Sequence, residues 1–258
     1  MMYQKILSFA LIFSLTGCVS SQVTNSPTGG EVQAKQANIQ EAAHQRLTLG
    51  LKYLEKGNLE RAKFNLDRAS MHAPESSEVM VGLAYYYQQV KEYELAEKYY
   101  QSSIAKSPNN GDNLNSYASF LCEQGQYKKA SQLFMRAINL VEYAGAGASY
   151  ENAGICAKRS GDLEKAKQYF NSALNYNSTA SKSLLEMADI TLQQKQFLQA
   201  RAFLRQHFHY SKPNPRALWL GIQIERLLGD KDALSSYQLQ LTGLFPDAPE
   251  TLLYQSSK

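Results

Sequence analysis

The chain has 258 residues, 44% of them hydrophobic, so it is long and apolar enough to bury a core. Its 27 Lys and Arg residues nearly balance 23 Asp and Glu residues, and no run of five like charges occurs, which argues against nucleic acid as a partner. Gly and Pro are sparse, whereas the good helix formers Ala, Leu, Gln, Lys and Glu are frequent. This composition predicts an all-α protein.

The first predicted element is an export signal. Lys5 precedes an apolar stretch, Ile6–Leu15, that is too short to span a bilayer but has the length of the central region of a secretory signal. The sequence Leu15-Thr16-Gly17-Cys18 follows, and it resembles the bacterial lipobox. The resemblance implies a lipoprotein signal peptide over residues 1–17 and acyl chains on Cys18. The alternative is an ordinary cleaved signal followed by an incidental cysteine.

Residues 18–36 are predicted to form a lipidated, flexible tether. The segment is rich in Ser, Thr, Gln and Asn, contains Pro27 and the pair Gly29-Gly30, and lacks helical periodicity. Residue 19 is Val rather than the Asp that retains many lipoproteins at the inner membrane. The resemblance to lipoproteins therefore implies a lipid anchor at the periplasmic face of the outer membrane.

A repeat of about 34 residues follows the tether. Small residues recur at this spacing on the second helix of each predicted pair, and a bulky residue stands four positions after each of them. The first helices carry another set of small residues. The three sets are Ala62, Ala96, Ala130, Ala166, Ala200 and Ala233; Leu66, Tyr100, Phe134, Phe170, Leu204 and Tyr237; and Gly50, Ala84, Ala118, Gly154, Ala188 and Gly221. This pattern resembles the tetratricopeptide repeat (TPR), in which paired helices cross closely at the small residues.

The resemblance implies a right-handed superhelical solenoid of six helix-turn-helix repeats over residues 37–247, with a C-terminal tail over residues 248–258. Extra residues around Tyr143 predict a longer turn between the third and fourth repeats. His207 stands at a position that is usually small, which predicts distorted packing between the last two repeats. The predicted repeats are 43–76, 77–110, 111–144, 147–180, 181–213 and 214–247.

No catalytic arrangement stands out. The histidines are not spaced as zinc ligands, and the carboxylates are scattered along helix faces, so we predict no metal site, no cofactor, no small-molecule substrate and no enzymatic activity. Cys122 and Cys156 fall on adjacent first helices of the third and fourth repeats, where an exported protein can form a disulfide. Two buried free thiols are the alternative.

The predicted functional surface is the concave groove, which positions 2, 5, 9 and 12 of each first helix face in a TPR stack. Its N-terminal part is apolar and turns polar toward the middle, which suits a helix or an extended segment of another protein. Alternatively, residues 31–42 fold back over Leu47 and Leu51. Lys158, Arg159 and Lys182 further along could receive an acidic tail. The predicted partner-binding residues are Leu47, Leu51, Leu54, Val81, Tyr85, Gln88, Asn115 and Ser119, with His44, Glu78, Asp112 and Cys122 at equivalent positions.

The lipobox, the tether, the six repeats and the cysteine-containing segments Tyr117–Gly125 and Asn152–Cys156 closely resemble the type IV pilus biogenesis lipoproteins of the PilF/PilW kind. That resemblance implies a non-enzymatic pilotin whose groove holds subunits of the pilus secretin, so that the secretin multimerises in the outer membrane and supports twitching motility. We expect a monomer. The alternative is a TPR lipoprotein adaptor for cell-wall hydrolases or synthases, or for another envelope assembly machine.

Overall fold

The computed structural model describes residues 29–257, with side chains described from residue 37 onward. The chain divides into two units, Met1–Asn38 and Ile39–Lys258. Every regular element among the described residues is an α-helix, as the composition predicts. The predicted signal peptide, Cys18 and the first part of the predicted tether lie outside the described residues.

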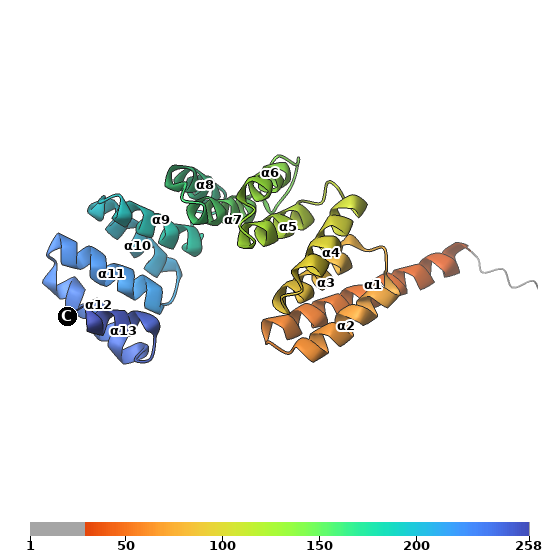
Figure 1. The fold of residues 1–258 in the computed structure, drawn as a ribbon, viewed down its shortest axis with the longest axis horizontal. Helices are drawn as coiled ribbons and strands as arrows, with labels where there is room; N and C mark the ends of the chain where they lie inside the picture. The colour runs from red at the N-terminus through yellow and green to blue at the C-terminus, as the bar shows by residue number, and fades with distance from the viewer. Residues whose placement is uncertain (1–28, 258) are drawn as a thin grey trace, which may run out of the picture. The chain divides into compact units, whose positions relative to one another are not determined.

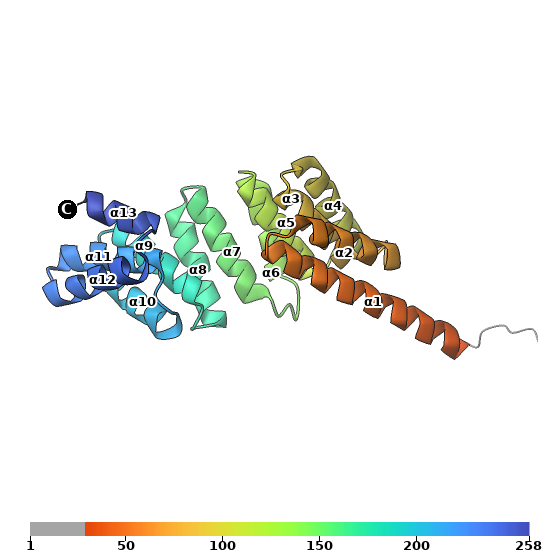
Figure 2. The same ribbon diagram turned by 90° about the horizontal axis from the view of Figure 1, so that it is seen from below.

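The helices of the second unit form a solenoid of pairs, in which a short turn joins two helices and each pair lies beside the next in chain order (Figures 1 and 2). The pairs are α1 (Gly29–Glu55) with α2 (Leu59–His72), α3 (Ser77–Gln89) with α4 (Tyr93–Lys106), α5 (Gly111–Glu123) with α6 (Tyr127–Ile138), α7 (Ala146–Arg159) with α8 (Leu163–Tyr176), α9 (Ser181–Gln193) with α10 (Phe197–Tyr210), and α11 (Pro215–Leu228) with α12 (Lys231–Leu244).

Small residues let the two helices of a pair approach closely. A Cβ atom at Gly50 would lie 2.8 Å from the Leu66 side chain, and one at Gly221 would lie 2.8 Å from the Tyr237 ring. The repeated alanines of α2, α4, α6, α8 and α10 are completely buried, whereas Ala233 of α12 is partly exposed. In the first, fourth and sixth pairs the bulky residue of the second helix therefore packs onto the glycine of the first helix, which explains in physical terms why a small residue recurs there.

The turns inside the pairs need a left-handed backbone. Gly57, Gly125 and Gly161 adopt φ values of 70°, 73° and 87° there, and Lys91 and Lys195 take the same place in the second and fifth pairs. Side chains cap the N-termini of several helices by accepting a hydrogen bond from the backbone N–H three residues later. These capping residues are Asn58, Ser76, Asn110, Asp162, Asn214 and Asp230.

Helix α1 begins before the first predicted repeat. Residues 29–36, predicted to belong to the tether, are helical, so this part of the prediction is wrong. The residues after Gly30 are mostly good helix formers, and extending a helix that packing already stabilises avoids the cost of nucleation. Residues 31–42 belong to the same continuous helix as Leu47 and Leu51, whereas the alternative required the chain to turn back before these residues.

The predicted C-terminal tail contains a thirteenth helix, α13 (Pro249–Ser256). Its Tyr254 is buried with Leu218, Ile222 and Leu241 of the last pair, and the Thr251 hydroxyl donates a 2.6 Å hydrogen bond to the Phe245 carbonyl. The end of a helix stack would otherwise expose an apolar face, which this helix covers.

Two departures from the repeat have local explanations. The predicted longer turn spans residues 139–145, where the Tyr143 hydroxyl donates to Asp112 Oδ1 at 2.9 Å and accepts from Ser149 at 3.3 Å. His207 is 3% exposed, and its Nδ1 donates to the Ser181 carbonyl at 2.8 Å while Nε2 accepts from Asn214. The histidine thus links the start of α9 to the residue that caps α11.

Candidate functional site

A groove of about 480 Å³ lies on the first helices of the first three pairs, α1, α3 and α5. We call it the N-terminal groove. Its apolar part contains Leu51, Val81 and Tyr85, of which Tyr85 is 36% exposed. The structure brings together seven of the predicted partner-binding residues here, namely Leu47, Leu51, Val81, Tyr85, Gln88, Asn115 and Ser119.

Leu54 does not line the groove, which corrects the prediction. It is 7% exposed and packs in the core with Leu66 and Leu83, because it stands next to the turn that brings α2 against α1. Leu47 lines the groove but is also 7% exposed, and its Cδ1 lies against the backbone of Gly82. Leu51 and Tyr85 are therefore better described as the accessible apolar anchors of the groove than Leu47 and Leu54.

Several groove residues do not follow from the four expected positions. Tyr100 and Phe120 lie at core positions of the repeat and are almost fully buried, yet they also line the groove. The Tyr100 hydroxyl donates to Gln88 Oε1 at 3.0 Å, and Gln88 Nε2 donates to Glu123 Oε2 at 2.6 Å. Burial, with the Glu123 carboxylate adding to it, raises the pKa of Tyr100 well above its ordinary value, so this hydroxyl keeps its proton. Glu123 stands one helical turn after Ser119, which is the signal that could have found it.

The charges at the N-terminal groove have one sign. Glu78, Asp112 and Glu123 line it, whereas no Lys, Arg or His does so in the part of the chain that the structure describes. Asp112 accepts the hydrogen bond from Tyr143, and Glu78 has no ion-pair partner among the described side chains. The groove is thus lined by apolar side chains together with carboxylates.

Further along the solenoid, a network of ion pairs links the first helices of the last three pairs. Lys158 of α7 pairs with Glu186 and Asp189 of α9, and Arg216 of α11 pairs with the same two carboxylates. Burial alone raises the pKa values of both carboxyl groups, but hydrogen bonds from Arg216 and Lys158 to Glu186, and from Lys158 to Asp189, outweigh burial and hold both pKa values below their usual range. Lys158 is therefore engaged within the protein, which corrects the suggestion that it receives an acidic tail.

Cys122 of α5 and Cys156 of α7 form a disulfide, with Cα atoms 5.7 Å apart. Both residues are 4% exposed and belong to one core cluster with Phe120 and Phe134. The bond joins the third repeat, which carries the end of the N-terminal groove, to the fourth. It thus crosses the boundary where the longer turn separates the two pairs.

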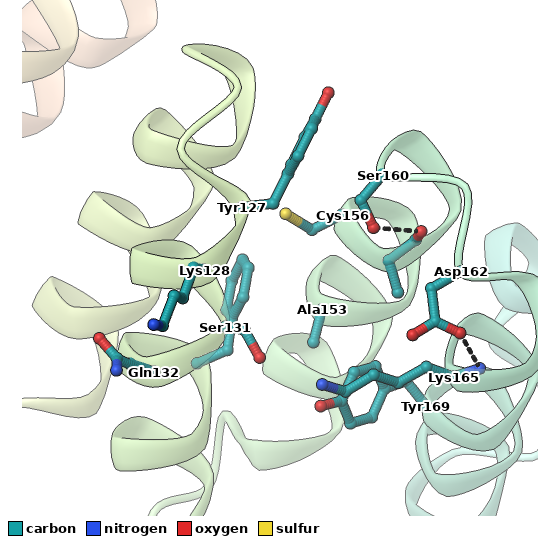
Figure 3. A pocket seen from close by; sticks show the side chains of 12 residues that line it. Tyr127, Lys128, Ser131, Gln132, Ala153, Cys156, Ser160, Asp162, Lys165 and Tyr169 are labelled. Atoms are coloured by element: carbon teal, nitrogen blue, oxygen red, sulfur yellow. Dashed lines mark hydrogen bonds between the residues drawn. The ribbon is translucent and has the colours of Figure 1, made fainter.

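A second cavity of about 410 Å³ lies between α6 on one side and α7 and α8 on the other (Figure 3). Ser131 of α6 faces Ala153 of α7 across it, and Cys156 forms part of its wall (Figure 3). Two of its charged groups are engaged on α8, because Asp162 caps that helix at the Lys165 N–H and the Lys165 ammonium lies 5.7 Å from the centre of the Tyr169 ring. Of these two sites, the N-terminal groove holds the predicted partner-binding residues and is the candidate binding site.

Neither a metal site nor a membrane span is found in the part of the chain that the structure covers. No group of three or more His, Cys, Asp or Glu side chains is placed to hold a metal ion within that part. Likewise, none of the described helices is both long and apolar enough to cross a bilayer.

Comparison with known proteins identifies relatives of this chain. Two tetratricopeptide repeat models match the chain, over residues 77–110 and 111–177. The type IV pilus assembly protein PilF of Pseudomonas aeruginosa is 33% identical over 260 residues, an alignment that covers 100% of both proteins. An uncharacterized protein of Haemophilus influenzae is 35% identical over 149 residues, which cover 58% of this chain and 76% of that protein.

Solved structures of PilF and PilW have the same fold as this chain. That of Pseudomonas aeruginosa PilF superposes with a TM-score of 0.74 at 32% identity, covering 86% of this chain and 100% of the other. PilW, described as a widely conserved type IV pilus biogenesis factor, has a TM-score of 0.74 at 20% identity, covering 83% and 98% of the two chains, and at that identity it supports the fold alone.

The fold and its groove define a TPR solenoid, a class of protein that binds other proteins and is not an enzyme family. Within this class, the chain belongs to the type IV pilus biogenesis TPR proteins of the PilF/PilW kind.

Proposed function

We propose that this protein is an outer-membrane lipoprotein that binds the type IV pilus secretin in its N-terminal groove and promotes the localisation and multimerisation of that secretin. The observation that carries the proposal is the open groove with accessible apolar side chains, Leu51 and Tyr85, in a chain related over its full length to a pilus assembly protein. Exposed apolar surface of this kind on a helical solenoid is typical of a protein-binding site. The function requires no catalysis, and we expect a monomeric adaptor.

The membrane part of the proposal depends on Cys18. The sequence Leu15-Thr16-Gly17-Cys18 supports lipidation there, with Val19 favouring the outer membrane. Each buried CH₂ group contributes about 0.8 kcal/mol, so several acyl chains would hold the protein at the membrane durably. The anchor would deliver the bound secretin subunits to the membrane in which they assemble.

Membrane fractionation of a Cys18→Ser strain tests this mechanism. We expect the variant to fold, because folding of the helix pairs does not depend on acyl chains, but to leave the outer-membrane fraction and to lower the amount of secretin multimer. A variant that stays in that fraction and supports normal multimers would contradict it. If deletion of the protein changes septation or peptidoglycan but leaves piliation intact, an adaptor for cell-wall enzymes is the correct function instead.

A further inference from the structure

The N-terminal groove carries a charge opposite to that of the whole chain. The protein has four more Lys and Arg residues than Asp and Glu residues, which gives a formal net charge of +4. By contrast, the described residues that line the groove include three carboxylates and no cation. Glu78 is exposed and unpaired within the described part, and Glu123 is held in place only by Gln88. Negative charges beside apolar side chains favour a partner that carries positive charge next to its own apolar side chains.

A polar group at the same place points to the same kind of occupant. Asn113 of α5 lines the groove, is 3% exposed, and has a buried amide nitrogen without a hydrogen-bond partner among the described residues. Buried side-chain donors are nearly always paired in proteins. A carbonyl oxygen of a bound main chain would supply the missing acceptor once this side chain turns toward the groove.

We propose that the N-terminal groove takes an apolar segment of its partner that carries a Lys or Arg beside the apolar anchors, with a main-chain carbonyl of that segment bound by Asn113. The inference rests on the groove's being the partner site, as proposed above. The segment Val19–Gly30 of this chain does not fit the description, because it contains neither Lys nor Arg. The apolar anchors would contact Leu51 and Tyr85, while the cation would lie near Glu78 or Glu123.

The test measures how tightly the detergent-solubilised full chain binds the purified periplasmic domain of the secretin from the same organism, at low and at high salt. Glu78→Gln combined with Glu123→Gln should weaken binding about four- to tenfold at low salt, and the difference from wild type should shrink at high salt. The control pair is Glu60→Gln with Glu94→Gln, which removes the same charge from exposed positions on the second helices α2 and α4. Unchanged binding, or an equal loss in the control, would overturn the proposal.

The substitution Asn113→Leu tests the role of Asn113 independently of the carboxylates. Leucine has a similar size and no donor, so binding should weaken while the melting temperature stays the same or rises, because an unpaired buried amide is removed. A lower melting temperature with unchanged binding would show that Asn113 serves the fold and would overturn its role.

Tyr85→Ala separates this inference from the proposed function. If Tyr85→Ala weakens secretin binding and the carboxylate variants do not, only the requirement for a basic segment fails. If none of these variants changes binding, the groove is not the secretin site, and the proposed function fails with it. A concentration-dependent dimer that Tyr85→Ala dissociates would overturn the proposal in favour of a second copy of this chain.

Discussion

The ring of Phe170 on α8 lies so close to Gly154 on α7 that a Cβ atom at Gly154 would be 2.7 Å from it. Gly154→Ala should therefore lower the free energy of unfolding by about 1–2 kcal/mol, because overpacking costs about 1–3 kcal/mol and alanine returns about 0.5–1 kcal/mol in a helix. Thermal or urea denaturation measures the change.

Gly243→Ala is the matched control for that substitution. Gly243 lies in α12, and a Cβ atom there would meet nothing within 4 Å. The same change should stabilise the protein by about 0.5–1 kcal/mol. Equal effects of the two substitutions would mean that the close approach of α7 and α8 does not constrain the repeat.

The disulfide should contribute measurably to stability. Cys122 and Cys156 are separated by 34 residues, and closing such a loop stabilises a protein by about 2–4 kcal/mol. Reduction, or substitution of both cysteines by serine, should lower the melting temperature while leaving helicity nearly unchanged. Mass mapping of periplasmic protein under non-reducing conditions should find both residues in one linked peptide pair, and alkylation of both thiols without reduction would contradict the bond.

Acid should weaken the network around Glu186 and Asp189. Their pKa values are lowered in the folded protein, so the unfolded chain binds more protons as pH falls, and stability rises with pH in that range. The contribution is complete above the ordinary values of 4.5 and 3.8 and is lost as pH falls through the lower folded values.

Melting temperatures between neutral pH and about pH 3 test this dependence. The double variant Glu186→Gln, Asp189→Asn should be less stable than wild type at neutral pH, because it leaves Lys158 and Arg216 without anionic partners. The difference in melting temperature between wild type and this variant should become smaller as the pH falls. A difference that does not change with pH would show that these carboxylates do not titrate differently in the folded and unfolded chains.

The helix pairs could be predicted from the sequence because their packing depends on the sizes of individual residues at fixed positions of the repeat. Gly50, Gly154 and Gly221 leave room for Leu66, Phe170 and Tyr237, and that size relation repeats along the chain. Position within a repeat was a weaker guide to exposure. Leu54 and Gln88 occupy the same position, but burying a leucine side chain gains about 1.5–3 kcal/mol, so Leu54 packs inward while Gln88 remains at the groove.

Features that depend on several distant residues escaped prediction. The engagement of Lys158 requires carboxylates about 30 positions later in the chain, and the orphan amide of Asn113 is visible only when all of its neighbours are placed. Helix α13 and the early start of α1 were missed for a different reason. Both extend a packed stack, and local composition says little about whether such an extension gains enough contacts.

The central claim is that the N-terminal groove binds the secretin, and the double variant Leu51→Glu, Tyr85→Ala tests it most directly. Phe134→Ala, at a side chain that is 1% exposed, is the control for loss of folding and should lower the melting temperature without addressing the groove. Because Leu51 also packs partly on the core, Tyr85→Ala alone is measured beside the double variant.

The measurement is the affinity of each variant for the periplasmic domain of the secretin, taken together with its melting temperature. We expect the double variant to lose about 2–4 kcal/mol of binding free energy and Tyr85→Ala to lose less, with a melting temperature close to wild type for Tyr85→Ala. Wild-type affinity in a folded double variant would contradict it.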